Sequence, residues 1–351
     1  MAQIYVLYQY LVLQSTLYYH YLTKLISVIC DENPLLVEIT KLFKIMAKSR
    51  IKRKYVLLFF QKQIDDLFAG GKIGTARNYQ SAFKSFSTFL DEKDIVFSTL
   101  TEDLVRNYDN WLQKTGIDKN SISFYMRILR SLYNKAVSQY FAKPVNPFQH
   151  VYTGIANTRK RAVSEQVIVL LQELELRSNP ALEFARDIFI FSYATRGMAF
   201  VDVAFLRKQN IHEDTITYTR HKTGQKLSIH LEPCMEKIIR RYQNRAKGSP
   251  YVFPLIKSNR LLKSYSQYRT ALGYYNRKLK KLGEMIGLDT PLTSYASRHA
   301  WATAARNHNI PLSIISAGMG HASENTTRIY LASLENAVID QANRDIIEIL
   351  N

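Results

Sequence analysis

Two blocks of helical periodicity, separated by a single break, are the feature that most limits what this chain can fold into. From about Arg53 to Tyr140, apolar side chains recur every three or four residues, as amphipathic helices require. The pattern resumes at Val163. Between the blocks lie two prolines, a glycine and a basic run, namely Pro144, Pro147, Gly154 and residues 158–161. Because 351 residues can form two cores, we predict a linker at about 150–160, with domains at 46–155 and 156–351.

The first block predicts a small helical bundle with a basic flank. Glycines end the first helix, and Thr75 is the expected N-cap of the second. A third helix is expected to open at Thr99 or Thr101 and to end at Gly116. The fourth runs from about Ser121 to Ser138.

The second block predicts helices around one small antiparallel sheet. Residues 214–220 and 225–231 alternate in polarity and are joined through residues 221–224, as in a β-hairpin. Helices are expected at about 164–175, 181–196, 232–246, 264–286 and 294–307, and after Pro311. The fold class is therefore mainly α, with a helical first domain and an α+β second domain.

The charge balance favours a polyanionic partner. A formal charge of +19 and a pI near 9.7 suit nucleic acid, although an anionic membrane surface would also attract such a protein. The two cysteines, Cys30 and Cys234, cannot form a disulfide framework or a four-ligand zinc site by themselves, which suits a reducing cytosol. The second block shows no tight run of Asp, Glu and His at ligand spacing. We therefore expect no metal and no cofactor.

The first 45 residues have no role that the sequence explains. No charged side chain precedes Lys24, and residues 4–29 are rich in Tyr, Leu and Val, so a membrane anchor has to be considered. Polar residues interrupt that run, and neither a basic n-region nor a small-residue cleavage site is present. We expect no membrane segment. Met46 opens a basic run, and our hypothesis is that it is the true start of the protein.

Two motifs near the C-terminus carry the chemistry. In residues 318–330, Gly318 and Gly320 are expected to end one short helix and Ser323 to cap the next, which brings His321 and Tyr330 toward one point. In residues 292–301, a helix capped by Thr293 or Ser294 is expected to place three side chains on neighbouring faces, namely Tyr295, Arg298 and His299.

Together the two motifs resemble the C-terminal pattern of the tyrosine recombinase (phage integrase) family, with its Arg-His pair, Gly-His loop and nucleophilic Tyr in the same order and spacing. The resemblance runs from about residue 55 to the C-terminus. It implies a helical, SAM-like core-binding domain that holds DNA, followed by a catalytic domain. It also implies that Lys222, in the hairpin turn, is the catalytic lysine, and that Tyr330 forms a 3′-phosphotyrosyl link.

The residue types fit this chemistry. Negative charge grows on a phosphodiester as a nucleophile adds, and the planar, permanently charged fork of Arg298 is suited to stabilise it. His321 would hydrogen-bond a phosphate oxygen. The departing 5′ oxygen needs a proton, which Lys222 would supply by analogy with the family. The link at Tyr330 would store the bond energy of the cut strand, so rejoining needs no ATP.

The chain departs from the family pattern at two positions. Tyr295 stands where the family usually has His, and a phenol is a poor proton acceptor at neutral pH. Ala199 stands where the family has its first Arg. If the preceding helix continues, Arg196 lies one turn earlier and is expected to reach the same phosphate, with Asp202 as a supporting carboxylate.

The remaining expectations concern partners. The residues expected to contact duplex DNA are Arg77, Lys84, Arg127, Arg130, Lys135, Arg159, Lys160 and Arg161. A tail helix at 335–350 would either join protomers into an oligomer, expected to be a tetramer on paired sites, or pack on its own core. The expected function is site-specific recombination in the cytoplasm. The alternatives are a DNA-binding protein that has lost catalysis and a nicking enzyme of the type IB topoisomerase kind.

Overall fold

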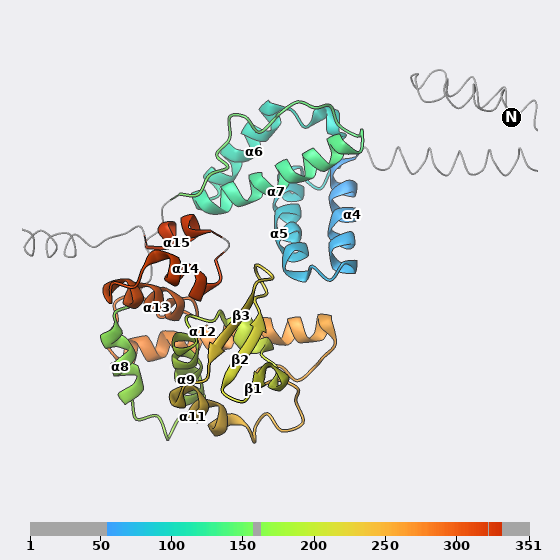
Figure 1. The fold of residues 1–351 in the computed structure, drawn as a ribbon. Helices are drawn as coiled ribbons and strands as arrows, with labels where there is room; N and C mark the ends of the chain where they lie inside the picture. Colours follow the sequence, from blue (N-terminus) through green and yellow to red (C-terminus); the bar gives the residue numbers. More distant parts are fainter. Residues whose placement is uncertain (1–54, 157–162, 322, 332–351) are drawn as a thin grey trace, which may run out of the picture. The chain divides into compact units, whose positions relative to one another are not determined.

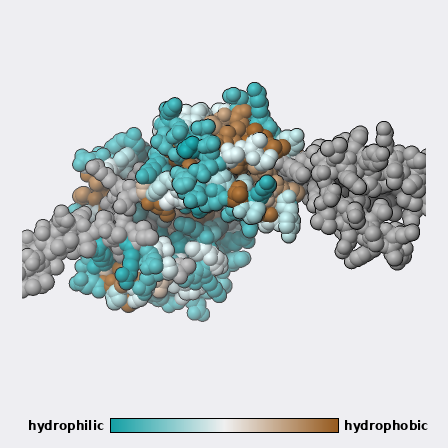
Figure 2. Space-filling model, turned by 90° about the horizontal axis from the view of Figure 1, so that it is seen from above, coloured by the Kyte–Doolittle hydropathy of each residue, from teal (hydrophilic) through white to brown (hydrophobic). Residues whose placement is uncertain are grey.

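The computed structural model describes residues 55–156, 163–321 and 323–331 (Figure 1). The chain divides into two compact units, and the first of them ends at Ala156. The predictions for residues 1–45, for the tail at 335–350 and for three linker residues, namely Arg159, Lys160 and Arg161, lie outside these ranges. No helix in the described ranges has the length and apolar character needed to cross a membrane. On the face seen in Figure 2, hydrophilic residues cover most of the described surface, and hydrophobic residues gather in one larger patch and several small ones.

The first unit consists of helices, as the sequence predicts. Its elements are α4 (Val56–Ala69), α5 (Ile73–Phe89), the 3-10 turn η2 (Phe97–Thr99), α6 (Glu102–Lys114) and α7 (Lys119–Ser138). Aromatic rings dominate the core. The Phe60 ring meets the rings of Tyr79 and Phe83 edge to face, at centroid distances of 5.8 and 5.5 Å. Such pairs add stability beyond the apolar area they bury, so the spacing of aromatic residues along α4 and α5 fixes how the two helices pack.

Only some of the predicted helix caps are observed in the structure. Thr101 caps α6, and its hydroxyl accepts from the amide of Leu104 at 3.3 Å. Asp118 caps α7, so that helix begins before the predicted Ser121. The prediction of Thr75 as a cap is wrong, because α5 starts at Ile73, whose buried side chain joins the first turn to the core.

The second unit surrounds a central helix, α9 (Pro180–Ala194), which packs against α11, α12 and α13 (Figure 1). Its other helices and turns are α8 (Glu165–Glu173), α10 (Phe200–Phe205), η3 (Lys208–Asn210), α11 (Pro233–Tyr242), α12 (Leu261–Met285), α13 (Ala296–Asn307), α14 (Leu312–Met319) and α15 (Glu324–Leu331). The mainly helical, two-part fold is therefore confirmed.

The predicted hairpin forms the main part of a three-stranded antiparallel sheet in the order β1-β2-β3. Strands β2 (Thr215–Thr219) and β3 (Lys226–His230) pair along their length, and Ile216 and Tyr218 point into the core. The short strand β1 (Ile211–His212) was not expected, because two residues are too few to show an alternating pattern.

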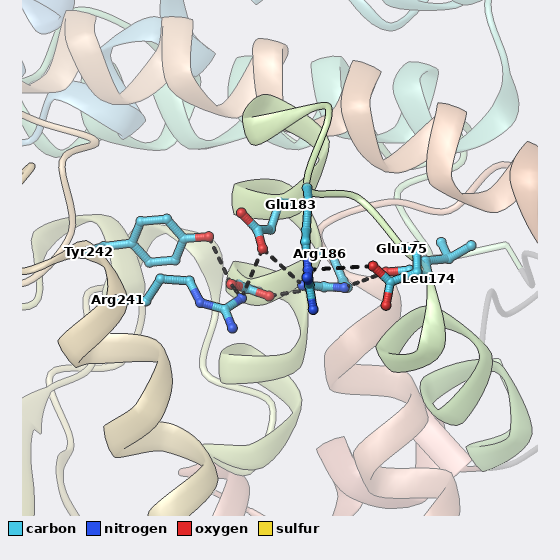
Figure 3. A network of polar contacts seen from close by, with 8 residues as sticks. Leu174, Glu175, Glu183, Arg186, Arg241 and Tyr242 are labelled. Carbon is cyan, nitrogen blue, oxygen red and sulfur yellow. Dashed lines mark hydrogen bonds and ion pairs between the residues drawn. The ribbon is translucent and has the colours of Figure 1, made fainter.

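A buried polar network holds α9 against α11 (Figure 3). The Asp187 carboxylate accepts from Arg241 at 2.7 Å and from the Tyr242 hydroxyl at 2.8 Å. On its other side, Asp187 pairs with Arg186, which also donates to the Leu174 carbonyl. Each buried charge thus has a partner, as stability requires, and the network fixes the scaffold on which the candidate site is built.

Candidate active site around Arg298 and His321

Arg298 is the centre of the candidate site. It lies in the first turn of α13, and only 2% of its surface is exposed. Its Nη1 donates to the Gly197 carbonyl at 2.8 Å and its Nη2 donates to the Met319 carbonyl. The loop after α9 and the end of α14, which are far apart in sequence, therefore fix the plane of the guanidinium. The structure gives Tyr295 as the N-cap of α13 without a side-chain capping bond, so the expected capping by Thr293 or Ser294 is wrong.

The loop before α10 is shaped by two left-handed residues. Arg196 has φ of 58° and Gly197 has φ of 70°. A Cβ atom on Gly197 would lie 2.7 Å from the Arg298 Cα, so only glycine fits this position. The expectation that the helix continues through Arg196 is wrong, because α9 ends at Ala194 and α10 begins at Phe200.

The left-handed turn nevertheless directs Arg196 toward the candidate site. Its Nη1 lies 3.4 Å from the Ser228 carbonyl on β3, and its side chain passes beside Gly318 on α14. Gly320 ends α14 as predicted, with φ of 62°, whereas the prediction for Gly318 is wrong, because α14 continues to Met319.

His321 follows Gly320 and bridges two elements of the site. Its Nε2 lies 3.2 Å from Nη2 of Arg298, and its Nδ1 lies 2.7 Å from the hydroxyl of Thr327 on α15. A guanidinium has no acceptor atom, so Nε2 must accept and Nδ1 must carry the proton and donate to Thr327. Burial lowers the pKa of His321 to about 4, with a further contribution from the positive charges of Arg298, Arg220 and Lys222.

Lys222 lies in the tight turn between β2 and β3. The Gly224 amide donates to the Arg220 carbonyl at 2.8 Å, and Gly224 supplies the positive φ that the turn needs. The Lys222 side chain is exposed, and its positive charge contributes to the lowered pKa of His321. The predicted support residue, Asp202, is 3% exposed and accepts from both the amide and the ring of His221, the residue before Lys222.

Sequence reasoning missed Arg220, which is 4% exposed and whose Nη1 donates to the Gly320 carbonyl. The bond links the hairpin turn to the loop that carries His321. A signal was present, since Arg220 continues the inward-facing alternation of Ile216 and Tyr218. Thr327, fully buried against His321, was also missed.

The pKa of Tyr218 responds to the charges of several of these groups. Burial raises the pKa of Tyr218, and the negative charge of Asp202 raises it further. Three arginine charges act in the opposite sense, namely those of Arg298, Arg220 and Arg196. The charges of one carboxylate and three guanidiniums therefore act on a single buried side chain, although their positions span more than a hundred residues of sequence.

The two candidate tyrosines differ in their settings. Tyr295 is 43% exposed, and its ring meets that of His299 edge to face at 5.1 Å. Tyr330 lies in the last turn of α15, a helix that packs against α13 and α14. The Tyr330 side chain lies outside the described part of the structure.

Three of the residues predicted to contact DNA, namely Arg127, Arg130 and Lys135, line a basic depression on α7. Its volume is about 460 Å³, it opens widely to solvent, and it is lined by Arg127, Arg130, Ser131, Asn134, Lys135 and Ser138. Arg130 donates to the Thr153 hydroxyl at 3.2 Å, and Lys135 donates to Gln63 at 3.2 Å. The other two predicted residues of this unit, Arg77 and Lys84, are exposed on α5 and do not line the depression.

Among the residues that the structure describes, no cluster of three or more His, Cys, Asp or Glu could hold a metal ion.

Comparison with family profiles identifies both units. The phage integrase SAM-like domain matches residues 55–152, and the phage integrase family matches residues 163–337. Among curated proteins, the chain is 20% identical over 273 residues to tyrosine recombinase XerD of Pseudomonas aeruginosa, covering 73% of this chain and 85% of that protein. It is 22% identical over 270 residues to a tyrosine recombinase of Pseudothermotoga lettingae, covering 76% of this chain and 90% of the relative.

Solved structures share the fold at low sequence identity. A lambda integrase dimer bound to a COC′ core site has a TM-score of 0.59 at 16% identity, with 81% of this chain and 80% of that chain covered. The Tn1549 transposon integrase in complex with circular intermediate DNA has a TM-score of 0.58 at 15% identity, with 83% and 99% covered.

Proposed function

The chain belongs to the phage integrase family of tyrosine recombinases, and on that premise we propose that it is a site-specific DNA recombinase that cuts and rejoins strands through a phosphotyrosyl link at Tyr330. The observation that carries the proposal is the direct contact between the buried guanidinium of Arg298 and His321, with Arg220 and Lys222 close by. A preformed group of cations beside the helix that bears Tyr330 suits one backbone phosphate.

In the proposed cleavage step, the Tyr330 oxygen attacks phosphorus and the bond from phosphorus to the 5′ oxygen breaks. Lys222 gives its proton to that oxygen, while the tyrosyl proton passes to solvent. Rejoining reverses each transfer, so the strand is restored without an external energy source. Arg298 stabilises the charge that grows on the non-bridging oxygens, and the carbonyls of Gly197 and Met319 orient it beforehand.

His321 changes its protonation state in this scheme. In the free protein its Nε2 accepts from Arg298, so the neutral ring has no proton to offer a phosphate at that atom. A bound phosphate supplies the negative charge that favours the imidazolium, whose Nε2–H then donates to a non-bridging oxygen. Thr327 keeps the ring oriented through Nδ1 during the change.

Arg196 is proposed as the second phosphate-binding arginine in place of the one that the family has at Ala199. Its direction toward β3 and α14, and its effect on Tyr218, support the assignment. Tyr295 is proposed as a hydrogen-bond donor to the phosphate, because its side chain is 43% exposed and carries a hydroxyl group that can donate.

The partner is proposed to be duplex DNA, with the cytoplasm as the place of action. We assign residues 46–155 to a core DNA-binding domain and 156–351 to the catalytic domain. The depression on α7 and the exposed Arg77 and Lys84 would contact the DNA backbone. Proteins of the same fold were solved as a dimer bound to a COC′ core site and as a tetramer bound to a Holliday junction, which supports assembly of this chain as a homo-oligomer on DNA. We propose the tail at 335–350 as the contact between protomers on its sequence pattern alone.

A second candidate, a DNA-binding protein without catalysis, is favoured by Ala199 and Tyr295. A nicked suicide site that carries the protein's target sequence distinguishes the two, because cleavage there releases a short strand and traps the covalent adduct. We expect the wild type to form the adduct and Tyr330→Phe to bind equally well without forming it. Equal binding with no adduct from the wild type would favour the second candidate, and cleavage without preference for paired sites would favour a topoisomerase.

A further inference from the structure

His221 makes an unusual set of contacts for a residue in a hairpin turn. Its backbone amide donates to Oδ1 of Asp202 at 2.9 Å, and its ring Nδ1 lies 2.8 Å from the same oxygen. Asp202 lies on α10 and is almost wholly buried, whereas the His221 side chain is 46% exposed. A single fixed carboxylate oxygen therefore binds the turn at both its main chain and its side chain.

A ring contact holds the same residue from another side. The His221 imidazole lies against the Phe205 ring, with a centroid distance of 5.0 Å and an interplanar angle of 39°. Phe205 is the last residue of α10, so Asp202 and Phe205 present one helix end to one imidazole. The turn itself is closed by the bond from the Gly224 amide to the Arg220 carbonyl.

Lys222, the proposed acid for the leaving oxygen, directly follows this anchored residue. An exposed lysine has a long side chain with many rotamers, and a mobile backbone beneath it would spread its ammonium group over a still larger volume. Anchoring the neighbouring residue to α10 removes the backbone part of that freedom. The effect on the reaction is one of proximity, since proton transfer requires the donor within hydrogen-bonding reach of the 5′ oxygen.

We propose that His221 is a positioning residue, which holds the β2–β3 turn on Asp202 so that Lys222 can protonate the leaving oxygen. The inference rests on the proposed function, because it assumes that Lys222 is the acid. His221 itself touches neither the substrate nor the tyrosine in this scheme. Its contribution is confined to the step in which the 5′ oxygen departs.

A substrate with sulfur in place of the bridging 5′ oxygen tests this role. A thiol has a pKa of about 8.5, whereas that of water is about 15.7, so a departing thiolate needs little help from an acid. Loss of acid catalysis therefore slows the oxygen substrate and leaves the sulfur substrate nearly unaffected. The ratio of the two cleavage rates, measured for one preparation of each variant, is independent of how much of the protein is folded.

Two variants of His221 test the contribution of the ring and that of its hydrogen bond separately. His221→Phe keeps a ring against Phe205 and loses the bond to Asp202, while His221→Asn keeps a side-chain donor and loses the ring. We expect His221→Phe to cleave the oxygen suicide site ~10-fold to 100-fold more slowly than the wild type and to cleave the sulfur site within a few fold of it. His221→Asn should stay close to the wild type on both, and Lys222→Ala should show the largest ratio.

Equal slowing of both substrates by His221→Phe, or no slowing of either, would overturn the inference while leaving the proposed function standing. Absence of a covalent adduct from the wild-type protein on both substrates would instead contradict the proposed function. A ratio for Lys222→Ala equal to that of the wild type would show that Lys222 is not the acid, and the positioning role of His221 would fall with it.

Discussion

The Arg298 guanidinium donates a hydrogen bond to Nε2 of His321 across 3.2 Å, and this contact fixes the tautomer and the charge of the histidine. With Nδ1 donating to Thr327, the neutral ring satisfies both of its nitrogens in the absence of DNA. A second proton at Nε2 would place a positive charge on the partly buried His321 directly against the buried Arg298. The free enzyme is therefore arranged to hold His321 neutral until a negative charge arrives.

The first prediction concerns pH and stability. The pKa of His321 is about 4 in the folded protein against 6.5 for an unperturbed histidine. Between these values the unfolded chain binds more protons, so the contribution of His321 to stability is fully present above pH 6.5 and is lost as the pH falls toward 4. Urea unfolding at a series of pH values should show a smaller loss for His321→Gln than for the wild type. Identical pH profiles for the two proteins would contradict the lowered pKa.

The second prediction concerns Gly197. An alanine there has to adopt a left-handed φ and to push its Cβ against the Arg298 backbone, so Gly197→Ala should lower the free energy of unfolding by about 2–5 kcal/mol. Gly248→Ala is the matched control in the same unit, because Gly248 has φ of 79° with nothing within 4 Å of the added Cβ. It should cost only about 1–2 kcal/mol. Chemical denaturation measures both, and equal losses would mean that the contact with Arg298 can relax.

The third prediction tests whether Arg196 replaces the missing arginine. Arg196→Ala should slow adduct formation on a suicide site by about 100-fold, as expected when a donor to the transition state is removed. Placing the family's arginine back, as Ala199→Arg in the Arg196→Ala background, should restore part of the rate. Arg245→Ala, an exposed arginine that stacks on Phe184 and Tyr242, is the control and should cleave like the wild type. Wild-type cleavage by Arg196→Ala would remove this residue from the site.

The fourth prediction concerns the depression on α7. If Arg127 and Lys135 contact phosphates, each change to alanine should weaken DNA binding uniformly across sequences and reduce the slope of log K against log salt by about 1. Lys119→Ala is the control, since Lys119 begins the same helix outside the depression and covers the Tyr152 ring. Binding titrations at several salt concentrations give the slopes. An equal change in slope for all three variants would show that the depression has no special part in binding.

Local patterns predicted the elements of the fold well, and the reasons are visible in particular residues. Alternating polarity predicted β2 and β3 because one face of the sheet is buried, and Thr101 predicted the start of α6 because its hydroxyl satisfies a free amide. Helix α9 ends at Ala194, two residues before the predicted end, because Arg196 adopts a left-handed φ, which arginine rarely does and which the sequence therefore did not indicate.

Contacts between distant parts of the chain could not be predicted in this way. The sequence motifs indicated Arg298 and His321, and the structure brings the two together. Arg220 was missed because a charged residue at the end of a strand is expected on the surface, and here its burial depends on a carbonyl 100 residues later. The contact of His221 with Asp202 likewise depends on how the sheet meets α10, which no local pattern describes.

The helix that bears Tyr330 rests on α13 and α14. Those two helices are joined by a small hydrophobic cluster, separate from the main core of the unit, that consists of Ala302, Ile315 and Met319 with Trp301 and Ala305 at its edge. A cluster of this size buries little apolar area, so detaching this corner costs far less than melting the unit as a whole. The proposed nucleophile, Tyr330, is thus carried by a helix that rests on elements joined by this small cluster. Amide exchange in α14 and α15 should accordingly outpace that in α9, and any opening of this corner would have to release the hydrogen bonds that join Met319 and Gly320 to Arg298 and Arg220.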